Sequence, residues 1–482
     1  MAARQERQRG RAPARRGGNR ADPARRAACD ALCAVAERDA YANLVLPAML
    51  AERGLTGRDA ALATELCYGT LRGSGTYDAI VAVCSDRELH TLEPPVLAVL
   101  RLGAHQLLAT RIQPHAAVAT SVDLIKDIAG PRPAGFVNAI LRRIASRDLE
   151  TWLMIAAPDR DQDLVGHLSV RYSHPRWIVT AFLQALGEDP DGGLAETEAA
   201  LAADGVRPRV TLCAVPGLAD PAELAAFGPA ARWSPFGVSL SDGDPAMIPA
   251  VAEHRAGVQD EASQLAALAL ARTPVTGGDS RWLDLCAGPG GKARLLAGLA
   301  AGAGARLAAA EPRLQRARMV RAATAPAGSA AVVAADGMRP GWRQAAFDRV
   351  IADVPCSGLG ALRRRPEARW RRSPADIENL GPLQRGLLAT AIDSARPGGV
   401  VAYVTCSPHL AETRDVVADV LAARGDAEVL DAPAVLAGLP GVPACMPGLR
   451  CPDPHGAYAQ FWPHRHGTDA IFLALLRRRP AS

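Results

Sequence analysis

Lysine is nearly absent from this chain of 482 residues, whose 55 basic residues are arginines except for Lys126 and Lys292. A lysine inside a motif therefore stands out. No stretch approaches about 18 uncharged apolar residues, and no apolar core follows the charged N-terminus, so neither a membrane span nor a signal peptide is expected. The ten cysteines form no CxxC pair, which argues against a structural zinc site, and we expect no metal.

Charge is distributed unevenly along the chain, whose net charge is +5. Residues 1–26 hold nine arginines against Glu6 and Asp22, so this segment has a net charge of +7 and the rest of the chain has about −2. We expect residues 1–23 to be a disordered Arg-rich tail that binds RNA phosphate through salt-sensitive charge neutralisation. A tail that only solubilises the protein is the alternative.

The length exceeds one ordinary core, so a multidomain protein is expected. Residues 24–150 show apolar spacing typical of helices and predict an all-α domain. The expected helices are 24–38, 41–53, 57–72, 76–84, 95–110, 116–127 and 135–146. Residues 151–256 open with helices and continue with two strand-like runs, which indicates a small α+β linker region. Residues 257–482 predict an α/β domain with a Rossmann-like sheet, of which residues 471–476 form the last strand.

Two cysteines follow mainly apolar runs: Cys356 in Asp353-Val-Pro-Cys-Ser-Gly-Leu-Gly360, and Cys406 in Val404-Thr-Cys-Ser-Pro408. Open α/β sheets hold ligands at the carboxyl ends of their strands, which is where a nucleophile belongs. A thiolate that adds to C6 of a pyrimidine makes C5 carbanion-like and able to attack an electrophilic methyl group. The two thiols therefore favour a cytosine methyltransferase. By the order used in DNA cytosine methyltransferases Cys356 would be the nucleophile, and the residues alone leave this open.

A glycine-rich turn follows an earlier apolar strand in Trp282-Leu-Asp-Leu-Cys-Ala-Gly-Pro-Gly-Gly-Lys292. Glycines there allow the backbone to approach a ligand beside the free amides of a helix start. The turn also satisfies the dinucleotide pattern, and Glu311, about 20 residues on, suits the ribose of either NAD or S-adenosylmethionine. A phosphate-binding loop fits less well, because Cys286 stands where it needs glycine.

Acidic residues recur at successive strand ends, at Glu311, Asp336 and Asp353. Such a row can bind ribose hydroxyls, an adenine amino group and the ammonium of methionine. Each acid could instead cap a strand-to-helix turn. Three acids in register favour the binding interpretation.

The chain resembles the Nol/Nop/Sun RNA cytosine-C5 methyltransferases, in particular the bacterial 16S rRNA branch (Sun/Fmu type) with an N-terminal NusB-like domain. The motifs quoted above carry the resemblance, as do Tyr172-Ser-His-Pro-Arg-Trp177, Val258-Gln-Asp-Glu-Ala-Ser-Gln-Leu265 and Trp462-Pro-His-Arg-His-Gly-Thr-Asp469. Glu65-Leu-Cys-Tyr-Gly-Thr-Leu-Arg72 and Phe136-Val-Asn-Ala-Ile-Leu-Arg142 are similar to the NusB-like RNA-binding domain. Two departures are mild: Gly288 stands where the family usually has alanine, and the residues after Ser407 follow the expected ending loosely.

The resemblance implies a class I methyltransferase domain at 257–482 that uses S-adenosylmethionine, and a helical RNA-binding domain at 24–150. It implies that Cys406 is the covalent nucleophile, that Cys356 assists product release, and that Asp353 lies between donor and base. It assigns cofactor binding to Cys286, Ala287, Gly288, Pro289, Gly290, Gly291, Lys292, Glu311, Asp336 and Asp353.

The resulting hypothesis is an S-adenosylmethionine-dependent RNA cytosine-C5 methyltransferase that acts on 16S rRNA, in the cytosol and as a monomer. Six arginines around Trp370 are expected to offer phosphate contacts and a stacking face near the base: Arg363, Arg364, Arg365, Arg369, Arg371 and Arg372. Transfer RNA as substrate, an inactive RNA-binding adaptor, and an NAD-dependent oxidoreductase are the alternatives, although the last explains neither cysteine.

Overall fold

The computed structural model describes residues 21–38, 40–187, 192–451 and 456–480. The chain divides into two compact units, residues 1–156 and residues 157–482. Most of the Arg-rich tail predicted for residues 1–23 lies outside the described residues. No helix in the described ranges is both long enough and apolar enough to cross a membrane.

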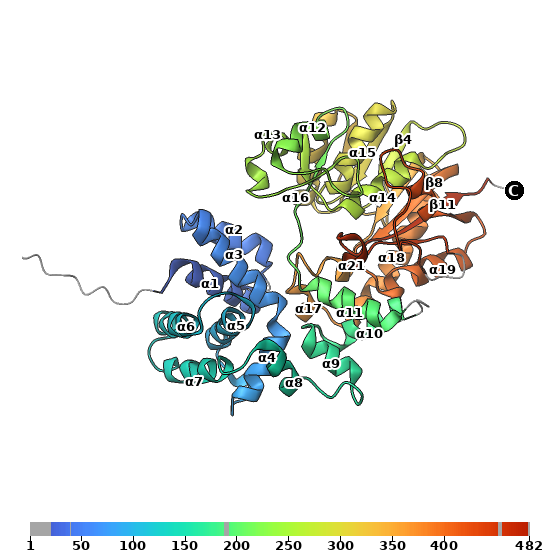
Figure 1. The fold of residues 1–482 in the computed structure, drawn as a ribbon. Coiled ribbons are helices and arrows are strands. Elements are labelled where there is room, and N and C mark those ends of the chain that lie inside the picture. The colour runs from blue at the N-terminus through green and yellow to red at the C-terminus, as the bar shows by residue number, and fades with distance from the viewer. Residues whose placement is uncertain (1–20, 39, 188–191, 452–455, 481–482) are drawn as a thin grey trace, which may run out of the picture. The chain divides into compact units, whose positions relative to one another are not determined.

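The described part of the first unit is helical (Figure 1). Its α-helices are α1 (Pro23–Arg38), α2 (Ala42–Glu52), α3 (Gly57–Arg72), α4 (Ser74–Cys84), α5 (Pro94–Ala109), α6 (Pro114–Ala129), α7 (Ala134–Ile144) and α8 (Leu149–Ala156). The first seven begin and end within two residues of the predicted ranges. Their apolar faces share one core, because each helix alternates buried and exposed residues at helical spacing.

Two details at the ends of this unit differ from the prediction. The boundary expected at residue 150 falls inside α8, where Trp152 is buried and its indole N–H donates to the Ile144 carbonyl at 2.8 Å. At the other end, two of the nine arginines counted with the tail belong to α1. Arg25 is buried and donates to Gln106 at 2.8 Å, and Arg26 pairs with Asp30 and Asp127.

The second unit opens with helices and then a small sheet, as the linker region was expected to do. The helices are α9 (Leu164–Arg171), α10 (Arg176–Leu186) and α11 (Gly193–Asp204). The sheet has three antiparallel strands in the order β2-β1-β3, with β1 at Thr211–Ala214, β2 at Gly237–Ser239 and β3 at Ala256–Val258. These segments share a compact unit with the residues that follow, so no separate unit ends near residue 256.

The main sheet has eight strands in the described residues and contains the path β10-β11-β8-β7-β4-β5-β6. Five strands run parallel: β4 (Arg281–Asp284), β5 (Arg306–Ala310), β6 (Ala330–Val333), β7 (Phe347–Asp353) and β8 (Ala395–Thr405). The predicted last strand is β11 (Phe472–Arg478), which pairs antiparallel with β8. Two short strands flank β11: β9 (Ala427–Leu430) and β10 (Ala459–Gln460).

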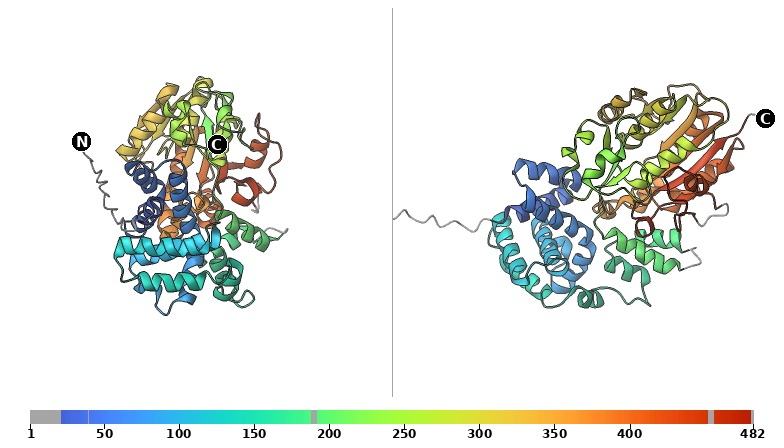
Figure 2. Two further views of the ribbon diagram at one scale, coloured as in Figure 1. Left: turned by 60° about the vertical axis from the view of Figure 1, so that its left-hand side comes forward. Right: turned by 45° about the horizontal axis from the view of Figure 1, so that its top comes forward.

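Helices cover both faces of this sheet (Figure 1 and Figure 2). One face packs against α14 (Glu261–Arg272) and α15 (Gly291–Gly302), and α16 (Leu314–Thr324) lies beside α15. The opposite face packs against α18 (Pro374–Ser394) and α19 (Arg414–Ala422). Strands buried on both faces are apolar almost throughout, which explains why their sequences read as continuous apolar runs.

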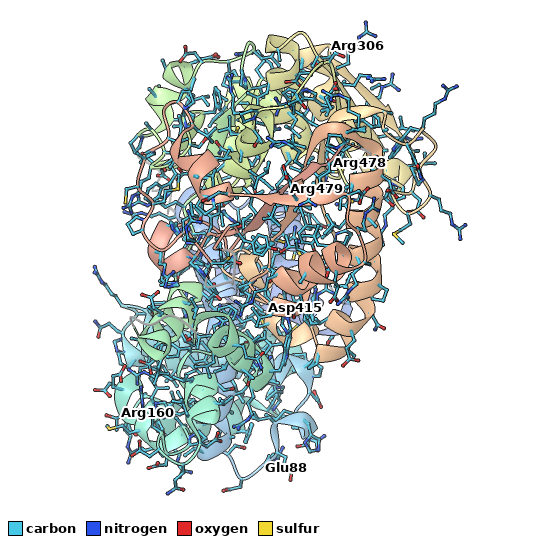
Figure 3. The ribbon with its side chains drawn as sticks, turned by 90° about the vertical axis from the view of Figure 1, so that its right-hand side faces the viewer. Glu88, Arg160, Arg306, Asp415, Arg478 and Arg479 are labelled. Atoms are coloured by element: carbon cyan, nitrogen blue, oxygen red, sulfur yellow. The ribbon has the colours of Figure 1, made fainter. Side chains whose placement is uncertain are left out.

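The amino edge of the parallel strands is rich in arginine. Arg306 begins β5, and Arg478 and Arg479 come at the end of the antiparallel β11 (Figure 3). Arg478 donates to the carbonyls of Asp393 and Ala395, at 2.9 and 2.8 Å. Arg478 thereby connects the end of β11 to the start of β8.

Candidate active site

The predicted site residues meet at the carboxyl edge of the main sheet. β4 lies between β5 and β7, where the strand order reverses, and α/β sheets bind ligands at such a point. Asp284 and Asp353 end β4 and β7, Glu311 follows β5, and Cys406 follows β8. Asp336 differs, because β6 ends at Val333 and Asp336 is exposed, where its carboxylate accepts a hydrogen bond from the nearby Met338 N–H at 2.9 Å.

The two cysteines lie side by side, as their positions on neighbouring strands predicted. Their sulfur atoms are 3.3 Å apart and both side chains are half-buried. The hydrogen bond with Cys406, burial, and the negative charges of Cys406 and Glu412 raise the pKa of Cys356 well above its ordinary value. Cys356 therefore keeps its proton at neutral pH.

Lys292 reaches the same place from the start of α15. Its Nζ donates to Asp353 Oδ2 at 2.8 Å and to Ser263 Oγ at 3.3 Å. Burial opposes the charge on Lys292, but the Asp353 carboxylate and the negative charge of Cys406 raise its pKa. A permanent cation is thus fixed next to both Asp353 and the thiol pair.

Asp284 is less exposed than Glu311 and Asp353 and was not singled out in the sequence. It is 1% exposed, and burial together with the charge of Asp353 raises its pKa to about 7. Its Oδ1 accepts from the Cys286 N–H at 3.3 Å, whereas its Oδ2 has no hydrogen-bond partner in the described part of the chain. A buried acceptor without a partner is a place for a ligand donor.

The surroundings of Cys286 confirm how acidic this pocket is. Burial, and then the charges of Asp284 and Asp353, raise the pKa of its thiol, with smaller effects from Glu311 and Asp336. Like charges held this close destabilise one another unless a cation joins them. The donor set therefore suits a cationic ligand better than an anionic one.

The glycine turn packs directly against Glu311. Gly290 has a φ of +116°, which favours glycine, and α15 begins at the next residue. A side chain at Gly288 would run into the Glu311 carboxylate, so the glycine that departs from the family pattern gives Glu311 its place. Arg316 donates to the Gly288 carbonyl at 2.6 Å, and the Arg313 N–H donates to Glu311 at 3.0 Å.

Other residues of the predicted turn have structural partners. The Ala287 N–H donates to the Ala310 carbonyl at 2.9 Å, which ties the turn to β5. Cys286 and Gly288 are half-buried, and Pro289 is exposed. The turn thus stands where a cofactor pocket was expected, and the role of each residue in binding stays a prediction.

The arginines around Trp370 correct one expectation. Arg363 and Arg369 are buried, and Arg364 is bound to the carboxylates of Asp260 and Asp469. Arg369 donates to the carbonyls of Ser173 and Asp204, at 3.1 and 2.6 Å. These three side chains therefore form intramolecular contacts that hold the loop in place, and they are not available to RNA phosphates.

The rest of that cluster is more accessible. Arg365 and Trp370 are exposed, and Arg371 and Arg372 are half-buried. Arg372 donates to the Ser357 carbonyl at 3.2 Å, next to Cys356. A smaller basic surface with one exposed aromatic ring thus remains beside the thiols.

Glu412, six residues after Cys406, is a second residue that the sequence did not reveal. It is fully buried, and its carboxylate accepts from the Ser357 N–H at 2.7 Å and from Ser407 Oγ at 2.6 Å. The only local signal is the serine that follows each cysteine. In the described ranges, no group of three or more His, Cys, Asp and Glu is placed to hold a metal ion.

Comparisons with known proteins agree with this architecture. A family model described as 16S rRNA methyltransferase RsmB/F matches residues 272–477, and a NusB family model matches residues 22–146. A putative methyltransferase, Rv1407 of Mycobacterium tuberculosis strain H37Rv, is 50% identical over 463 residues, which is 95% of this chain and 97% of that protein.

A relative with a named activity and a solved structure extend the match. Ribosomal RNA small subunit methyltransferase B of Pseudomonas putida is 32% identical over 469 residues, which is 95% of this chain and 99% of that protein. The crystal structure of PH0851 has a TM-score of 0.73 at 20% identity, and the match covers 95% of this chain and 98% of that one. The predicted fold class is thereby confirmed.

Proposed function

The chain belongs to the RsmB/F family of 16S rRNA methyltransferases, and on that premise we propose that it transfers a methyl group from S-adenosylmethionine to C5 of a cytosine in 16S rRNA. The 3.3 Å separation of the Cys356 and Cys406 sulfurs at neighbouring strand ends carries the proposal. A covalent route through C6 needs one thiol that attacks and one group that manages protons beside it.

Cys406 is the nucleophile in this proposal, and Cys356 is its neutral partner. The raised pKa of Cys356 supports this order, because a thiol that keeps its proton donates a hydrogen bond and does not attack. Cys406 is among the groups that raise the pKa of Lys292, so the nucleophile interacts with this cation. These contacts argue against the reverse order, in which Cys356 attacks.

The chemistry at the base then follows from the thiol pair. Cys406 Sγ bonds to C6, and the electron pair of the C5–C6 double bond moves to C5. S-adenosylmethionine, when bound, would supply an electrophilic methyl group, whose bond to the donor sulfur breaks as the bond to C5 forms. Once C5 is methylated, its proton leaves to a base, the double bond re-forms, and the C6–S bond breaks with its electrons returning to sulfur. Cys356 is placed to give the departing sulfur a proton. Asp353, held by Lys292, faces the same space and is placed to hold the base edge.

The carboxylates at the strand ends support S-adenosylmethionine over NAD. Asp284, Glu311 and Asp353 act together on the pocket around Cys286. They suit the sulfonium and ammonium of S-adenosylmethionine, whereas they would repel the pyrophosphate of NAD. In the proposed site the turn at residues 286–292 and Glu311 hold the cofactor, with Asp336 beside its adenine.

Other parts of the proposal rest on the family and on the cysteines. The helical domain is assigned to RNA binding on its NusB family match. The cytosol is the proposed setting, since both thiols must stay reduced, and a monomer is the proposed state. Transfer RNA remains the second candidate substrate.

Two substitutions test the chemistry. Cys406→Ala should abolish methyl transfer to 16S rRNA while S-adenosylmethionine still binds, because only the attack on C6 is lost. Cys356→Ala should instead accumulate protein bonded to RNA, visible as a slow band on a denaturing gel. Full turnover by Cys406→Ala would show that Cys406 is not the nucleophile. If Cys356→Ala gives no slow band, Cys356 does not assist product release. Cys445→Ala, at an exposed cysteine in another part of the second unit, is the matched control.

A further inference from the structure

The serines that follow the two cysteines converge on one buried carboxylate. Ser357 donates to Glu412 through its N–H at 2.7 Å and also through its hydroxyl. Ser407 donates its hydroxyl at 2.6 Å. Glu412 thereby joins the loop after β7 to the loop after β8, which are 50 residues apart in sequence at the two cysteines.

Gln384 of α18 completes this group, here called the carboxylate cluster: Ser357, Gln384, Ser407 and Glu412. Its side-chain N–H donates to Glu412 at 3.1 Å and to the Pro355 carbonyl at 2.9 Å. Ser357 is 2% exposed and the other three members are fully buried. Four donors thus satisfy one carboxylate, which is the arrangement that makes a buried charge tolerable.

The cluster fixes the backbone on both sides of Cys356. The residue before it is held through the Pro355 carbonyl, and the residue after it through the Ser357 N–H. Cys406 is held from the other side, because the Gly360 N–H donates to its carbonyl at 2.8 Å. Both cysteines are carried by these loops, so the distance between the sulfurs depends on how the loops are held.

We propose that Glu412 is the positioning residue of the thiol pair: its carboxylate sets the distance between Cys356 and Cys406, and its charge adds to the electrostatic field at Cys356. This inference rests on the proposed function. The four hydrogen bonds account for the geometry. The negative charge of Glu412 is one of the causes, after the hydrogen bond with Cys406, burial and the charge of Cys406, that raise the pKa of Cys356.

Two variants of the full-length protein separate the effect of side-chain length at position 412 from the effect of its charge. Glu412→Gln keeps the length of the side chain and can form four hydrogen bonds if the serine hydroxyls turn to accept, but it removes the charge. Glu412→Asp keeps the charge but is one methylene shorter, so it cannot bond to both serines at once. Glu261→Gln is the control, since that buried carboxylate accepts from the N–H groups of Trp233 and Ser234, away from the thiols.

The first measurement needs no RNA and reports on the thiols directly. Each variant is treated with iodoacetamide at several pH values, and mass spectrometry follows alkylation of Cys356 and Cys406 separately. In Glu412→Gln, alkylation of Cys356 should begin at lower pH than in the wild type. A profile that matches the wild type would overturn the assigned role of the charge, and the same shift in Glu261→Gln would also overturn it.

The second measurement is methyl transfer to 16S rRNA. Glu412→Asp should lower kcat by about 100-fold with both KM values unchanged, because a small displacement of reacting groups has that effect. Glu412→Gln should lose less. Wild-type kcat in Glu412→Asp would overturn the positioning role. If Glu412→Asp does not fold, the alkylation profile of Glu412→Gln still tests whether Glu412 acts on Cys356. A wild-type protein without transferase activity would instead refute the proposed function and leave the thiol measurement intact.

Discussion

Asp284 shows how a single side chain can prepare a site for a charged ligand at a cost in stability. Burial and the charge of Asp353 raise its pKa to about 7 in the folded chain, whereas the pKa of a solvated aspartate is about 4. As the pH rises from 4, the unfolded chain loses this proton and the folded chain keeps it. The residue therefore lowers the free energy of unfolding progressively up to pH 7, and by a constant amount above it.

Asp284→Asn should remove that dependence. The thermal midpoint of the variant minus that of the wild type should increase between about pH 4 and pH 7 and then level off. Differential scanning calorimetry of the ligand-free protein at several pH values checks this. Asp336→Asn, which removes an exposed carboxylate, is the control for the loss of one carboxylate. A difference for Asp284→Asn that does not change with pH would contradict the prediction.

At this scale the sequence revealed the residues that follow an apolar run and concealed those that depend on distant partners. Cys356, Cys406 and Glu311 each stand just beyond a strand, so their place could be predicted. Asp284 lies inside its apolar run and reads as part of the strand. Glu412 takes its partners from up to 55 residues away, which no local pattern contains.

The same limit explains the arginines near Trp370. A count of basic residues says nothing of their partners, and the partners of Arg364, Asp260 and Asp469, lie 104 and 105 residues away in opposite directions. A charged cluster becomes a binding surface only where the fold leaves it unpaired.

Among the elements, α15 depends most closely on one backbone conformation. Gly290 turns the chain with a positive φ immediately before the helix, and a side chain there would meet Ala323 at 3.0 Å and the Val320 backbone at 3.2 Å. Alanine would add strain of about 1–3 kcal/mol and push the turn away from α16. The conformation of Gly290 therefore joins the start of α15 to the turn that is proposed to bind the cofactor.

Gly290→Ala should weaken S-adenosylmethionine binding by about 10-fold, as expected for a displacement that costs about 1.4 kcal/mol. Isothermal titration calorimetry of the variant measures this. Gly302→Ala changes the last residue of the same helix, where a side chain would meet open space, and should leave the affinity unchanged. Equal affinities for both variants would show that the turn tolerates a side chain.

Helices were easier to predict than sheet pairing. The apolar period of residues 24–146 is local, and seven helices follow it within two residues. The pairing of β11 with β8 joins residues some 70 apart and runs antiparallel, which the composition of the strand does not specify. The segment from Leu430 to Pro443, which gave no pattern, forms the end of β9 and the short helix α20 (Ala432–Ala437).

At the scale of the whole molecule, the net positive charge comes from the first residues of the chain. Residues 1–20 contribute seven arginines and one glutamate. If they contact RNA phosphates, each contact displaces counterions and adds to the salt dependence of binding. The two arginines that belong to α1 have partners within the helical unit and would remain after the tail is removed.

Deletion of residues 1–20 should flatten the slope of log affinity against log salt concentration, by about 0.7 for each lost contact with single-stranded RNA. Filter binding of a 16S rRNA fragment across a salt series provides the slope. A deletion that keeps the seven arginines but removes Ala2, Ala3 and Ala12 serves as the control. An unchanged slope would make these residues bystanders in RNA binding.

Domain organisation followed from length and from the change in apolar period, but its boundaries did not. The helical domain was expected to end at residue 150, whereas Trp152 inserts its ring into the core of the first unit. Near residue 256, the small sheet and α14 pack within one compact unit. Such boundaries depend on which surfaces bury one another, and a period along the chain does not record that.

The closeness of the two sulfurs, 3.3 Å, also makes the enzyme vulnerable to air. A peroxide that converts one thiol to a sulfenic acid leaves the other within reach to displace water and close a disulfide. Under the proposed roles, that single bond would remove the nucleophile and its helper together, and a reductant such as dithiothreitol would restore both thiols. Preparations kept without reductant would therefore contain folded protein that has no methyltransferase activity until the disulfide is reduced.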